Sequence, residues 1–339
     1  MTEHVPAVRT EGLRRTYGDK RALDGLDMTV PRGTVHGVLG PNGSGKTTLV
    51  RTLATLLRVE RGRAEVAGID VGARPREVRK RIGLLGQHAA VDEELSGRQN
   101  LEMFGRLHRL GRPRAAARAD ALLERFGLEE TGHKAVGAYS GGMRRRLDLA
   151  ASLIVDPEVL FLDEPTTGLD PRGRTEVWNA VRSLVGGGTT VLLTTQYLEE
   201  ADQLADRISV LDRGWVIAEG TADTLKAMVG GDRVDVVLRD RAGLPGAAAV
   251  LAEVAVAGTV EADEDARRVS APVADRMAAL THVVRALHDR GIEAEDLTVR
   301  RPTLDEVFMH LTGGPADRVD RAGGAPHADR SGHDGKVSA

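Results

Sequence analysis

Short apolar runs alternate with longer, mixed segments over roughly the first two thirds of the chain. The apolar runs have the length of strands, and the segments between them favour helices. Such alternation is typical of a parallel sheet covered by helices, so residues 1–228 predict an α/β domain. The runs that predict buried strands are Val35–Leu39, Ile82–Leu85, Val159–Leu162, Thr189–Thr195 and Ile208–Leu211.

The stretch from Arg98 to Val155 departs from this alternation. No run in it predicts a strand, and turn-forming residues interrupt it at Gly111–Pro113 and at Gly127. Glycine and proline at such points favour the ends of helices over their interiors. We therefore expect residues 98–155 to form a helical insertion within the α/β domain.

The pattern changes again near Asp232, and residues 232–312 predict a small α+β domain in which Val234–Leu238 and Thr298–Arg300 pair. Residues 313–339 are rich in Gly, Ala, Asp, Arg and His, a composition that predicts a disordered tail. The predicted strands of the small domain are Val234–Leu238, Thr259–Glu261, Arg268–Val269 and Glu293–Val299, and its predicted helices are Ala247–Val256 and Ala274–Arg290.

The composition narrows the classes of protein that the chain can represent. Apolar residues make up 41% and charged residues 29% of the 339 residues, as in ordinary globular proteins. The absence of cysteine excludes a disulfide framework, a thiolate metal site and a catalytic cysteine. Apolar stretches such as Leu149–Val155 are far below the roughly 18 residues that span a bilayer, and Met1–Thr10 lacks the apolar core of a signal peptide. We expect a soluble, cytoplasmic chain.

A glycine-rich segment between a predicted strand and a predicted helix carries the first candidate chemistry. It fits the pattern G-x-x-x-x-G-K-[ST], follows Val35–Leu39 and opens a helix expected over Lys46–Leu57. Its glycines let backbone N–H groups surround phosphate oxygens, and the helix N-terminus adds partial positive charge. Lys46 can reach the β- and γ-phosphates, and the Thr47 hydroxyl can ligate Mg²⁺. The residues expected to bind the nucleotide are Gly40, Pro41, Asn42, Gly43, Ser44, Gly45, Lys46, Thr47 and Thr48.

Two acidic residues that follow a predicted strand supply the second half of this site. Ligands of a parallel sheet lie at the carboxyl ends of its strands, so Asp163 and Glu164, directly after Val159–Leu162, emerge beside the glycine-rich segment. Asp163 is suited to hold Mg²⁺, and Glu164 can accept a proton from an attacking water. Taken alone, an Asp-Glu pair after a strand is more often a solvated turn.

A second anion site is predicted at Tyr139-Ser140-Gly141-Gly142-Met143. Ser140 suits the N-cap of the helical run Arg144–Val155, and Gly141 and Gly142 expose backbone donors. Such a segment by itself is more often only a capped helix. Beside the first site, it suggests that a nucleotide held by one copy of the chain is covered by this segment of another copy.

These segments occur in the order and approximate spacing of the ATP-binding subunits of ABC transporters, which the chain resembles over about residues 7–228. The resemblance implies a P-loop NTPase sheet with antiparallel N-terminal strands and a helical insertion, followed here by the small α+β domain. It also implies a head-to-tail homodimer that encloses two ATP, in which the Ser-Gly-Gly segment of one protomer closes on the γ-phosphate held by the other. The matching segments are Gly40–Thr47, Gln87, Tyr139–Met143, Val159–Glu164 and Gly168-Leu169-Asp170.

The resemblance further implies roles for single residues. Tyr17 would stack on adenine, Gln87 would sense Mg²⁺ or water and face the membrane partner, and Asp170 would couple the two sites across the dimer. The helical insertion would dock a coupling helix of a transmembrane permease subunit. The implied metal ligands are Thr47, Gln87 and Asp163, and the implied catalytic residues are Glu164, Lys46 and Gln196.

One position departs from the common pattern of that family. After Thr189–Thr195 the family usually has a histidine that contacts the γ-phosphate, whereas this chain has Gln196. An amide can donate a hydrogen bond to a phosphate oxygen, but it carries no charge. Gln196 with the Tyr-Leu-Glu-Glu-Ala-Asp that follows it, together with Arg301–Gly313, resembles the drug-export branch typified by daunorubicin-resistance subunits.

The sequence thus predicts an ATP- and Mg²⁺-dependent exporter subunit, which moves a drug, antibiotic or lipid-like compound through separate membrane subunits at the cytoplasmic side of the cell membrane. One alternative is a soluble ATPase of this type that acts on nucleic acid or ribosomes. The single ATPase module and the net charge of −3 argue against it, and no nucleic-acid partner is expected. An importer subunit is a further alternative. For residues 232–312, regulation, a brace of the dimer and assembly with the membrane subunit all stay open, and we favour the brace.

Overall fold

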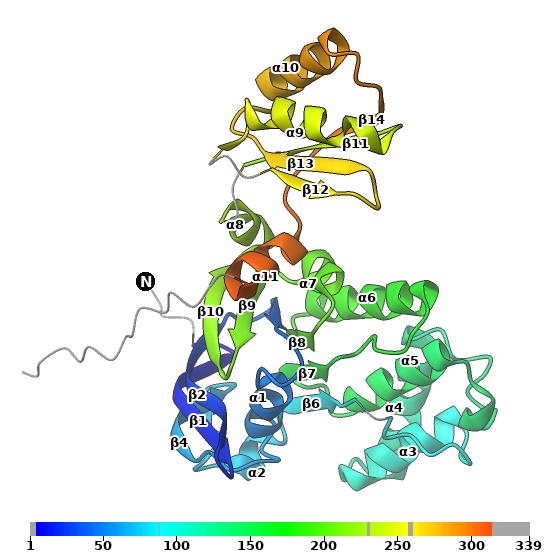
Figure 1. The fold of residues 1–339 in the computed structure, drawn as a ribbon. Helices are drawn as coiled ribbons and strands as arrows, with labels where there is room; N and C mark the ends of the chain where they lie inside the picture. Colours follow the sequence, from blue (N-terminus) through cyan, green and yellow to red (C-terminus); the bar gives the residue numbers. More distant parts are fainter. Residues whose placement is uncertain (1–4, 88, 229–230, 257–259, 314–339) are drawn as a thin grey trace, which may run out of the picture.

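Six strands form the central sheet of the larger domain in the computed structural model, which describes residues 5–87, 89–228, 231–256 and 260–313 (Figure 1). Their order is β10-β9-β3-β8-β7-β6, and β10 alone among them runs antiparallel to its neighbour. The strands are β3 (Val35–Leu39), β6 (Ile82–Leu85), β7 (Val159–Asp163), β8 (Thr190–Thr195), β9 (Arg207–Asp212) and β10 (Trp215–Gly220).

Both faces of the central sheet are covered, which explains why its strands are continuous apolar runs. On β7, Leu160 and Leu162 pack into the core beneath the helical insertion. Val159 and Phe161 point to the opposite face, where they pack into the core shared with the first helix and the N-terminal strands. Every residue of β3, β7 and β8 is buried, as expected for a parallel sheet between two layers.

The N-terminal strands form a separate, antiparallel sheet of order β2-β1-β4-β5. β1 and β2 form a hairpin that pairs from Val8 with Val30 to Tyr17 with Lys20. The antiparallel N-terminal strands implied by the family resemblance are therefore present, and they make a sheet of their own instead of extending the central one. The strands are β1 (Val8–Tyr17), β2 (Lys20–Val30), β4 (Arg61–Val66) and β5 (Ile69–Asp70).

Residues 98–155 consist of helices joined by turns and loops, with breaks at Gly111 and Gly127, whose φ angles of 75° and 60° are positive. Ser96 begins the first of these helices with a capping box, because its hydroxyl accepts from the Gln99 backbone N–H and its own backbone N–H donates to Gln99 Oε1. The helices of the larger domain are α1 (Lys46–Leu53), α2 (Pro75–Val78), α3 (Gly97–Leu107), α4 (Arg112–Arg125), η1 (Val136–Ala138), α5 (Gly141–Ser152), α6 (Pro171–Gly186), α7 (Leu198–Leu204) and α8 (Ala222–Ala227).

Two helices of the larger domain differ from the bounds expected from the sequence, and in the small domain α9 covers Leu244–Ala252 instead of Ala247–Val256. α1 ends at Leu53 instead of Leu57, because Thr55 adopts a left-handed conformation with φ 63°, which a continuing helix does not allow. α5 begins at Gly141, directly after its N-cap Ser140, and not at Arg144. The two glycines of the Ser-Gly-Gly segment therefore belong to the first turn of the helix.

The small domain is a four-stranded antiparallel sheet of order β12-β13-β11-β14 with two helices packed on it. β11 pairs with β14 in the expected register, with Val234 opposite Val299 and Asp235 opposite Thr298. The predicted strand start at Thr259 and the predicted tail beyond residue 313 lie outside the described residues. The elements are β11 (Arg233–Leu238), η2 (Arg241–Gly243), α9 (Leu244–Ala252), β12 (Glu261–Asp263), β13 (Arg268–Pro272), α10 (Arg276–Asp289) and β14 (Ala294–Arg300).

The last helix, α11 (Leu304–Gly313), packs on the larger domain beside α7 and α8, although its sequence position suggested a place in the small domain (Figure 1). Leu304 and Val307 are buried in one apolar cluster with Leu39, Ile208 and Leu225 of the larger domain. The reason is its amphipathic spacing, since residues 304, 307, 308 and 311 share a helix face that joins this cluster.

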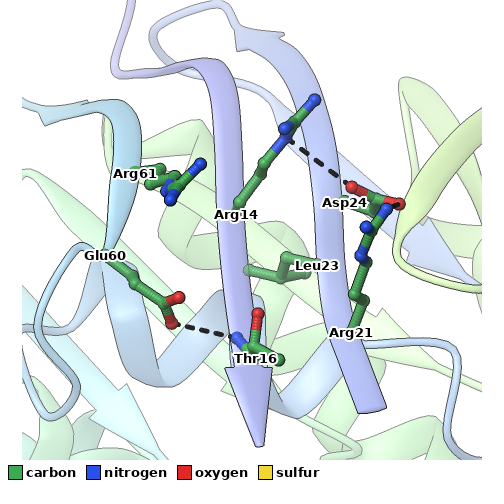
Figure 2. A pocket seen from close by; sticks show the side chains of 7 residues that line it. All are labelled: Arg14, Thr16, Arg21, Leu23, Asp24, Glu60 and Arg61. Carbon is green, nitrogen blue, oxygen red and sulfur yellow. Dashed lines mark hydrogen bonds and ion pairs between the residues drawn. The ribbon is translucent and has the colours of Figure 1, made fainter. Parts of the chain in front are cut away.

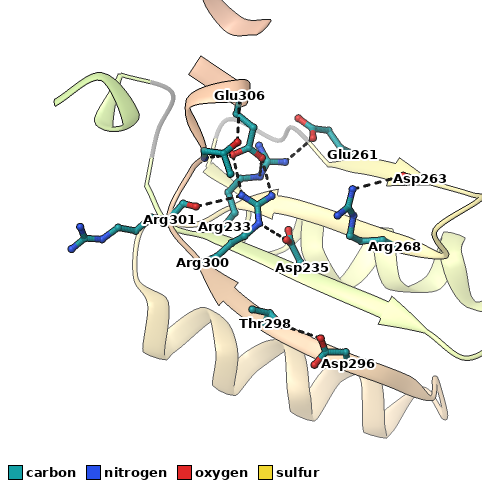
Figure 3. A network of polar contacts seen from close by, with 11 residues as sticks. Arg233, Asp235, Glu261, Asp263, Arg268, Asp296, Thr298, Arg300, Arg301 and Glu306 are labelled. Carbon is teal, nitrogen blue, oxygen red and sulfur yellow. Dashed lines mark hydrogen bonds and ion pairs between the residues drawn. The ribbon is translucent and has the colours of Figure 1, made fainter. Parts of the chain in front are cut away.

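A polar network connects α11 to the sheet of the small domain (Figure 3). Arg300 of β14 donates to the two Glu306 carboxylate oxygens at 2.9 and 3.0 Å, and to Asp235 of β11 at 2.5 Å. Buried Arg233 lies 3.3 Å from the same Glu306 carboxylate. Burial works against the charged form of Glu306, but these arginines outweigh it and lower the pKa of Glu306.

Candidate nucleotide-binding site

The glycine-rich segment forms the loop between β3 and α1, at the carboxyl edge of the central sheet. Its backbone is packed so closely that side chains have no room at two positions. A Cβ on Gly40 would run into the carbonyl oxygen of Leu211, and one on Gly45, whose φ is 114°, would run into that of Ala22. Glycine is therefore required at both positions, and the loop's N–H groups stay accessible.

The N-terminus of α1 offers uncapped donors. Gly45 is its N-cap and supplies no side-chain acceptor, and no acidic residue lies in the first turn. Beside it the Ser44 hydroxyl is buried and has no hydrogen-bond partner among the described residues. Free backbone donors, the helix dipole and an unpartnered hydroxyl together fit a phosphate group.

Lys46 brings a buried positive charge to this loop. Its side chain is only 4% exposed, and its ammonium donates to the Gly40 and Pro41 carbonyls at 2.7 and 3.1 Å. The Glu164 carboxylate lies 3.8 Å away. Burial lowers the pKa of Lys46, and the nearby Glu164 and Asp163 carboxylates oppose that shift. The ammonium is thus held at the loop, where phosphate charge would stabilise it further.

Three oxygen-bearing side chains meet at the end of β7. The Thr47 hydroxyl donates to Asp163 Oδ1 at 3.3 Å, and Gln87 Nε2 lies 3.5 Å from the Thr47 hydroxyl. Thr194 of β8 donates to the same Asp163 oxygen at 2.6 Å and so fixes the carboxylate. The hydroxyl and the carboxylate beside a phosphate loop match the hard-oxygen preference of Mg²⁺, and the Gln87 amide, whose nitrogen faces Thr47, also carries an oxygen. The residues expected as metal ligands therefore fit that ion.

Glu164 has a strained backbone. Its φ of 51° is left-handed, a conformation that costs a residue with a side chain about 1–2 kcal/mol. The Glu164 amide donates to the Thr194 carbonyl at 3.0 Å, and its carboxylate lies beside Lys46. Strain of this kind persists only where the surroundings hold it, and it is concentrated at functional sites.

Lys46, Thr47 and Glu164 line one hollow together with Gln87, and Tyr17 borders it at the end of β1. Asp163 is buried and is not among the lining residues. The Tyr17 ring is 46% exposed, and the Arg15 guanidinium lies 5.3 Å from its centroid. An exposed ring at the rim of a phosphate site is placed to stack on a base. The lining residues are Tyr17, Lys20, Ala22, Asn42, Gly43, Gly45, Lys46, Thr47, Thr48, Gln87 and Glu164.

The Ser-Gly-Gly segment lies in a different hollow of the same chain. The Ser140 hydroxyl caps α5 by accepting from the Met143 amide at 3.2 Å, and Asp170 caps α6 by accepting from Gly173 at 2.8 Å. A Cβ on Gly142 would lie 3.5 Å from the Gly173 Cα atom, so the two helix N-termini are close neighbours. The lining residues are Ser140, Gly141, Gly142, Met143, Arg146, Gly168, Leu169, Asp170, Arg172, Gly173 and Glu176.

Gln196 is half-buried and follows β8 at the same sheet edge as the phosphate loop. β8 is the neighbour of β3, and Thr195 pairs with Leu39. Gln196 and Gly40 therefore leave adjacent strand ends. The structure places Gln196 beside the loop, and it lines neither of the two hollows.

Some residues of the site had no signal in the sequence. Thr194 fixes Asp163, but in the run Thr190–Thr195 it looks like any other β-branched strand residue. Lys20 and Ala22 reach the hollow from β2, whose register follows from its pairing with β1. Such residues belong to the site because of tertiary pairing, which a single sequence does not display.

A further pocket, on the N-terminal sheet, contains none of the predicted site residues (Figure 2). Its charges largely neutralise one another, since Arg14 and Arg21 both lie beside Asp24, at 3.6 and 3.0 Å. The Glu60 carboxylate accepts from the Thr16 amide. Exposed pairs of this kind contribute little to binding or stability, so we assign the nucleotide to the loop after β3.

A phosphate loop, an Asp-Glu strand end and a separate Ser-Gly-Gly half-site on one α/β domain define an ATP-binding subunit of an ABC transporter. The family model described as ABC transporter matches residues 23–167, and one described as ATP-binding protein DrrA1-3-like, C-terminal domain, matches residues 220–312. The chain belongs to the DrrA-type ATP-binding subunits of ABC transporters.

Named relatives cover almost the whole chain. The daunorubicin resistance ATP-binding protein DrrA3 of Streptomyces coeruleorubidus is 72% identical over 91% of this chain and 96% of its own length. The daunorubicin/doxorubicin resistance ATP-binding protein DrrA of Streptomyces peucetius is 50% identical over 93% of this chain and 95% of its own length. The Nod factor export ATP-binding protein I of Ralstonia nicotianae is 39% identical over 91% of this chain and 94% of its own length.

Solved structures match the larger domain. A nucleotide-free ATP-binding cassette from an ABC transporter superposes with a TM-score of 0.59 at 26% identity, over 64% of this chain and 92% of that one. The structure of cbiO1 from Clostridium perfringens, part of the ABC transporter complex cbiONQ, superposes with a TM-score of 0.61 at 28% identity. The match covers 66% of this chain and 92% of that one.

Proposed function

We propose that this chain is the ATP-hydrolysing subunit of an exporter for a drug or a lipid-like compound. The relatives above are named for daunorubicin and doxorubicin resistance and for Nod factor export, and their likeness extends through the small domain. These names favour export over an ATPase that acts on nucleic acid or ribosomes. The observation that carries the proposal is the pair of phosphate-directed half-sites in separate hollows of one chain.

The separation of the half-sites supports an ATP-dependent homodimer. Ser140, Gly141 and Gly142 present the N-terminus of α5 in a hollow that Lys46 does not reach. In a head-to-tail dimer, each of these segments covers the phosphate loop of the other protomer. Closure buries nucleotide that neither protomer buries alone, so ATP favours the closed dimer over separate chains. Asp170, beside Ser140, would then contact the partner as well.

The residues of this chain divide the work of hydrolysis. The loop amides and Lys46 hold the phosphates, and Thr47, Asp163 and Gln87 would hold Mg²⁺, which neutralises charge on the phosphoryl group. Glu164 would take the proton of the attacking water, and the donors of the Ser-Gly-Gly segment offset developing negative charge. Gln196 can add a neutral hydrogen bond to a phosphate oxygen.

A separate membrane subunit would carry the export path and hold this chain at the cytoplasmic side of the membrane. Within the described residues, none of the helices combines the length and the apolar character needed to cross a bilayer. A groove between the central sheet and the helical insertion, with Leu56, Phe104 and His108 in its lining, is suited to receive a helix of that subunit.

The test is Glu164→Gln, which keeps the size of the side chain and removes the base. We expect the variant to bind MgATP, to lose hydrolysis by a factor of about 10² or more, and to elute as a dimer when ATP is present. Size-exclusion chromatography and a phosphate-release assay measure both effects. Glu158→Gln is the matched control, because Glu158 directly precedes β7 at the end away from the phosphate loop and its carboxylate pairs with Arg32 and Arg81. A Glu164→Gln variant that stays monomeric with ATP and hydrolyses it normally contradicts the proposal.

A further inference from the structure

Arg145 is a largely buried arginine that connects three parts of the larger domain. It lies on α5, and its side chain is 10% exposed. Nε donates to the Pro165 carbonyl at 2.7 Å, Nη2 to the Glu164 carbonyl at 3.3 Å and Nη1 to the Gly86 carbonyl at 2.9 Å. One guanidinium thus spans the helix of the Ser-Gly-Gly segment, the peptides after β7 and the peptide before Gln87.

Two of the three carbonyls that Arg145 binds belong to Glu164, whose backbone is strained, and to Pro165, which follows it. Glu164 has a φ of 51°, and its amide is fixed by Thr194 on one side. Its carbonyl and that of Pro165 point to Arg145 on the other side. Thr194 and Arg145 therefore hold the left-handed residue from both directions, and this is the kind of surrounding that such a conformation requires.

We propose that Arg145 is a positioning residue for ATP hydrolysis: it holds the backbone of Glu164 so that the carboxylate faces the γ-phosphate position at the Lys46 loop. The inference rests on the proposed role of Glu164 as the base. Arg145 acts through the Glu164, Pro165 and Gly86 carbonyls. Among the described residues its ion-pair partner is Asp148, which does not line the Lys46 hollow.

Arginine is the side chain that this arrangement requires. Its planar guanidinium carries five N–H donors in a fixed fork, so it can serve three carbonyls that lie in different directions. Asp148, one turn further along α5, orients the fork from 3.5 Å and also accepts from the Ala90 amide at 2.9 Å. A lysine at residue 145 would offer these carbonyls a single donor nitrogen. A glutamine would reach at most one of the three carbonyls.

The experiment compares Arg145→Gln and Arg145→Lys with the natural full-length chain. We expect Arg145→Gln to lower kcat by about 10- to 100-fold, because small misplacements of a catalytic group cost rates of this size. The Kd for MgATP, measured with a fluorescent analogue, should change less than threefold, since the Lys46 loop is untouched. Arg145→Lys should keep the same Kd and lose less of kcat.

Arg118→Gln is the matched control. Arg118 of α4 also donates from a guanidinium to a carbonyl of the α5 region, that of Leu153, but at the end of α5 away from Glu164. We expect its kcat to stay within twofold of the natural chain. A kcat of Arg145→Gln that equals that of the Arg118→Gln control overturns the proposal, and so does an equal loss of kcat and of nucleotide affinity.

Amide hydrogen exchange gives a readout that needs no turnover. The peptide that contains residues 163–168 should exchange faster in Arg145→Gln and Arg145→Lys than in the natural chain and in Arg118→Gln. If the natural chain proves unable to hydrolyse ATP, the proposed function fails, and exchange still decides whether Arg145 fixes this backbone. Unchanged exchange in both variants contradicts the role of Arg145 whatever the hydrolysis rates are.

Discussion

Single residues of the site are held in unfavourable states by a few specific partners. Lys46 is buried as an ammonium because two loop carbonyls and a carboxylate surround it. Glu164 keeps a left-handed backbone between Thr194 and Arg145. Both examples place charge or strain where phosphate chemistry is expected, and the cost is offset by packing elsewhere in the domain.

The burial of His36, on β3 just before the phosphate loop, predicts that the free energy of unfolding depends on pH. It is fully buried, its Nε2 lies 2.8 Å from the Ser209 hydroxyl, and burial, with Arg207 as a second cause, lowers its pKa to about 4. The unfolded chain binds this proton near pH 6.5 and the folded chain only near pH 4. The free energy of unfolding therefore falls as the pH drops from about 6.5 to about 4, by about 2 kcal/mol at pH 5.

The check is urea denaturation of the natural chain and of His36→Gln at pH 7 and pH 5. Glutamine cannot take up a proton, so the variant should lose about 2 kcal/mol less than the natural chain between the two pH values. Other titrating groups are common to both chains and cancel in the comparison. Equal losses in the two chains would show that His36 titrates normally in the folded protein.

Among the elements, α11 connects the two domains by packing on one and pairing with the other. Its apolar face joins the cluster of Leu39, Ile208 and Leu225, and its Glu306 reaches Arg300 and Arg233 of the small domain. The helix therefore stabilises the larger domain although the chain reaches it only after the small domain is complete.

Leu304→Ala should destabilise the larger domain. Leu304 is 3% exposed, and the loss of a buried leucine side chain typically costs about 2–5 kcal/mol. Met309→Ala is the control on the same helix, because Met309 is 65% exposed and should change stability by less than about 0.5 kcal/mol. Urea denaturation measures both. If Leu304→Ala matches its control, α11 does not pack on the larger domain in solution.

Some strands and site residues could be predicted from the sequence, and others could not. β3, β7 and β8 were predictable because a strand buried on both faces is one uninterrupted apolar run. β1 and β2 were not placed residue by residue, since charged residues and register shifts near Gly12 interrupt their alternation. The phosphate loop was predictable because its spacing is local. Arg145 looked like one member of an arginine run, because its three carbonyl partners come from distant segments.

For the whole molecule, the two hollows predict a specific contact between chains. The chain contains no cysteine, so a thiol-specific cross-linker would react only with cysteines introduced by mutation. We expect a variant with both Asn42→Cys and Ser140→Cys, together with Glu164→Gln, to form a cross-linked dimer with MgATP and a short bis-maleimide. The reason is that residue 42 lines one hollow and residue 140 the other. Reducing gels measure the yield, because the thioether cross-link survives reduction and a disulfide does not. Each single cysteine variant should stay uncross-linked, and equal yields with and without ATP would contradict the head-to-tail dimer.

The return of the chain to the larger domain at α11 has a mechanical consequence. The small domain lies between α8 and α11, so it is tethered at both of its ends. A domain on one tether can swivel, whereas two tethers leave only a hinge rotation about the line that joins them. Because α11 also touches α7, which starts at Leu198 just beyond Gln196, a tilt of the small domain would displace the helix that follows Gln196.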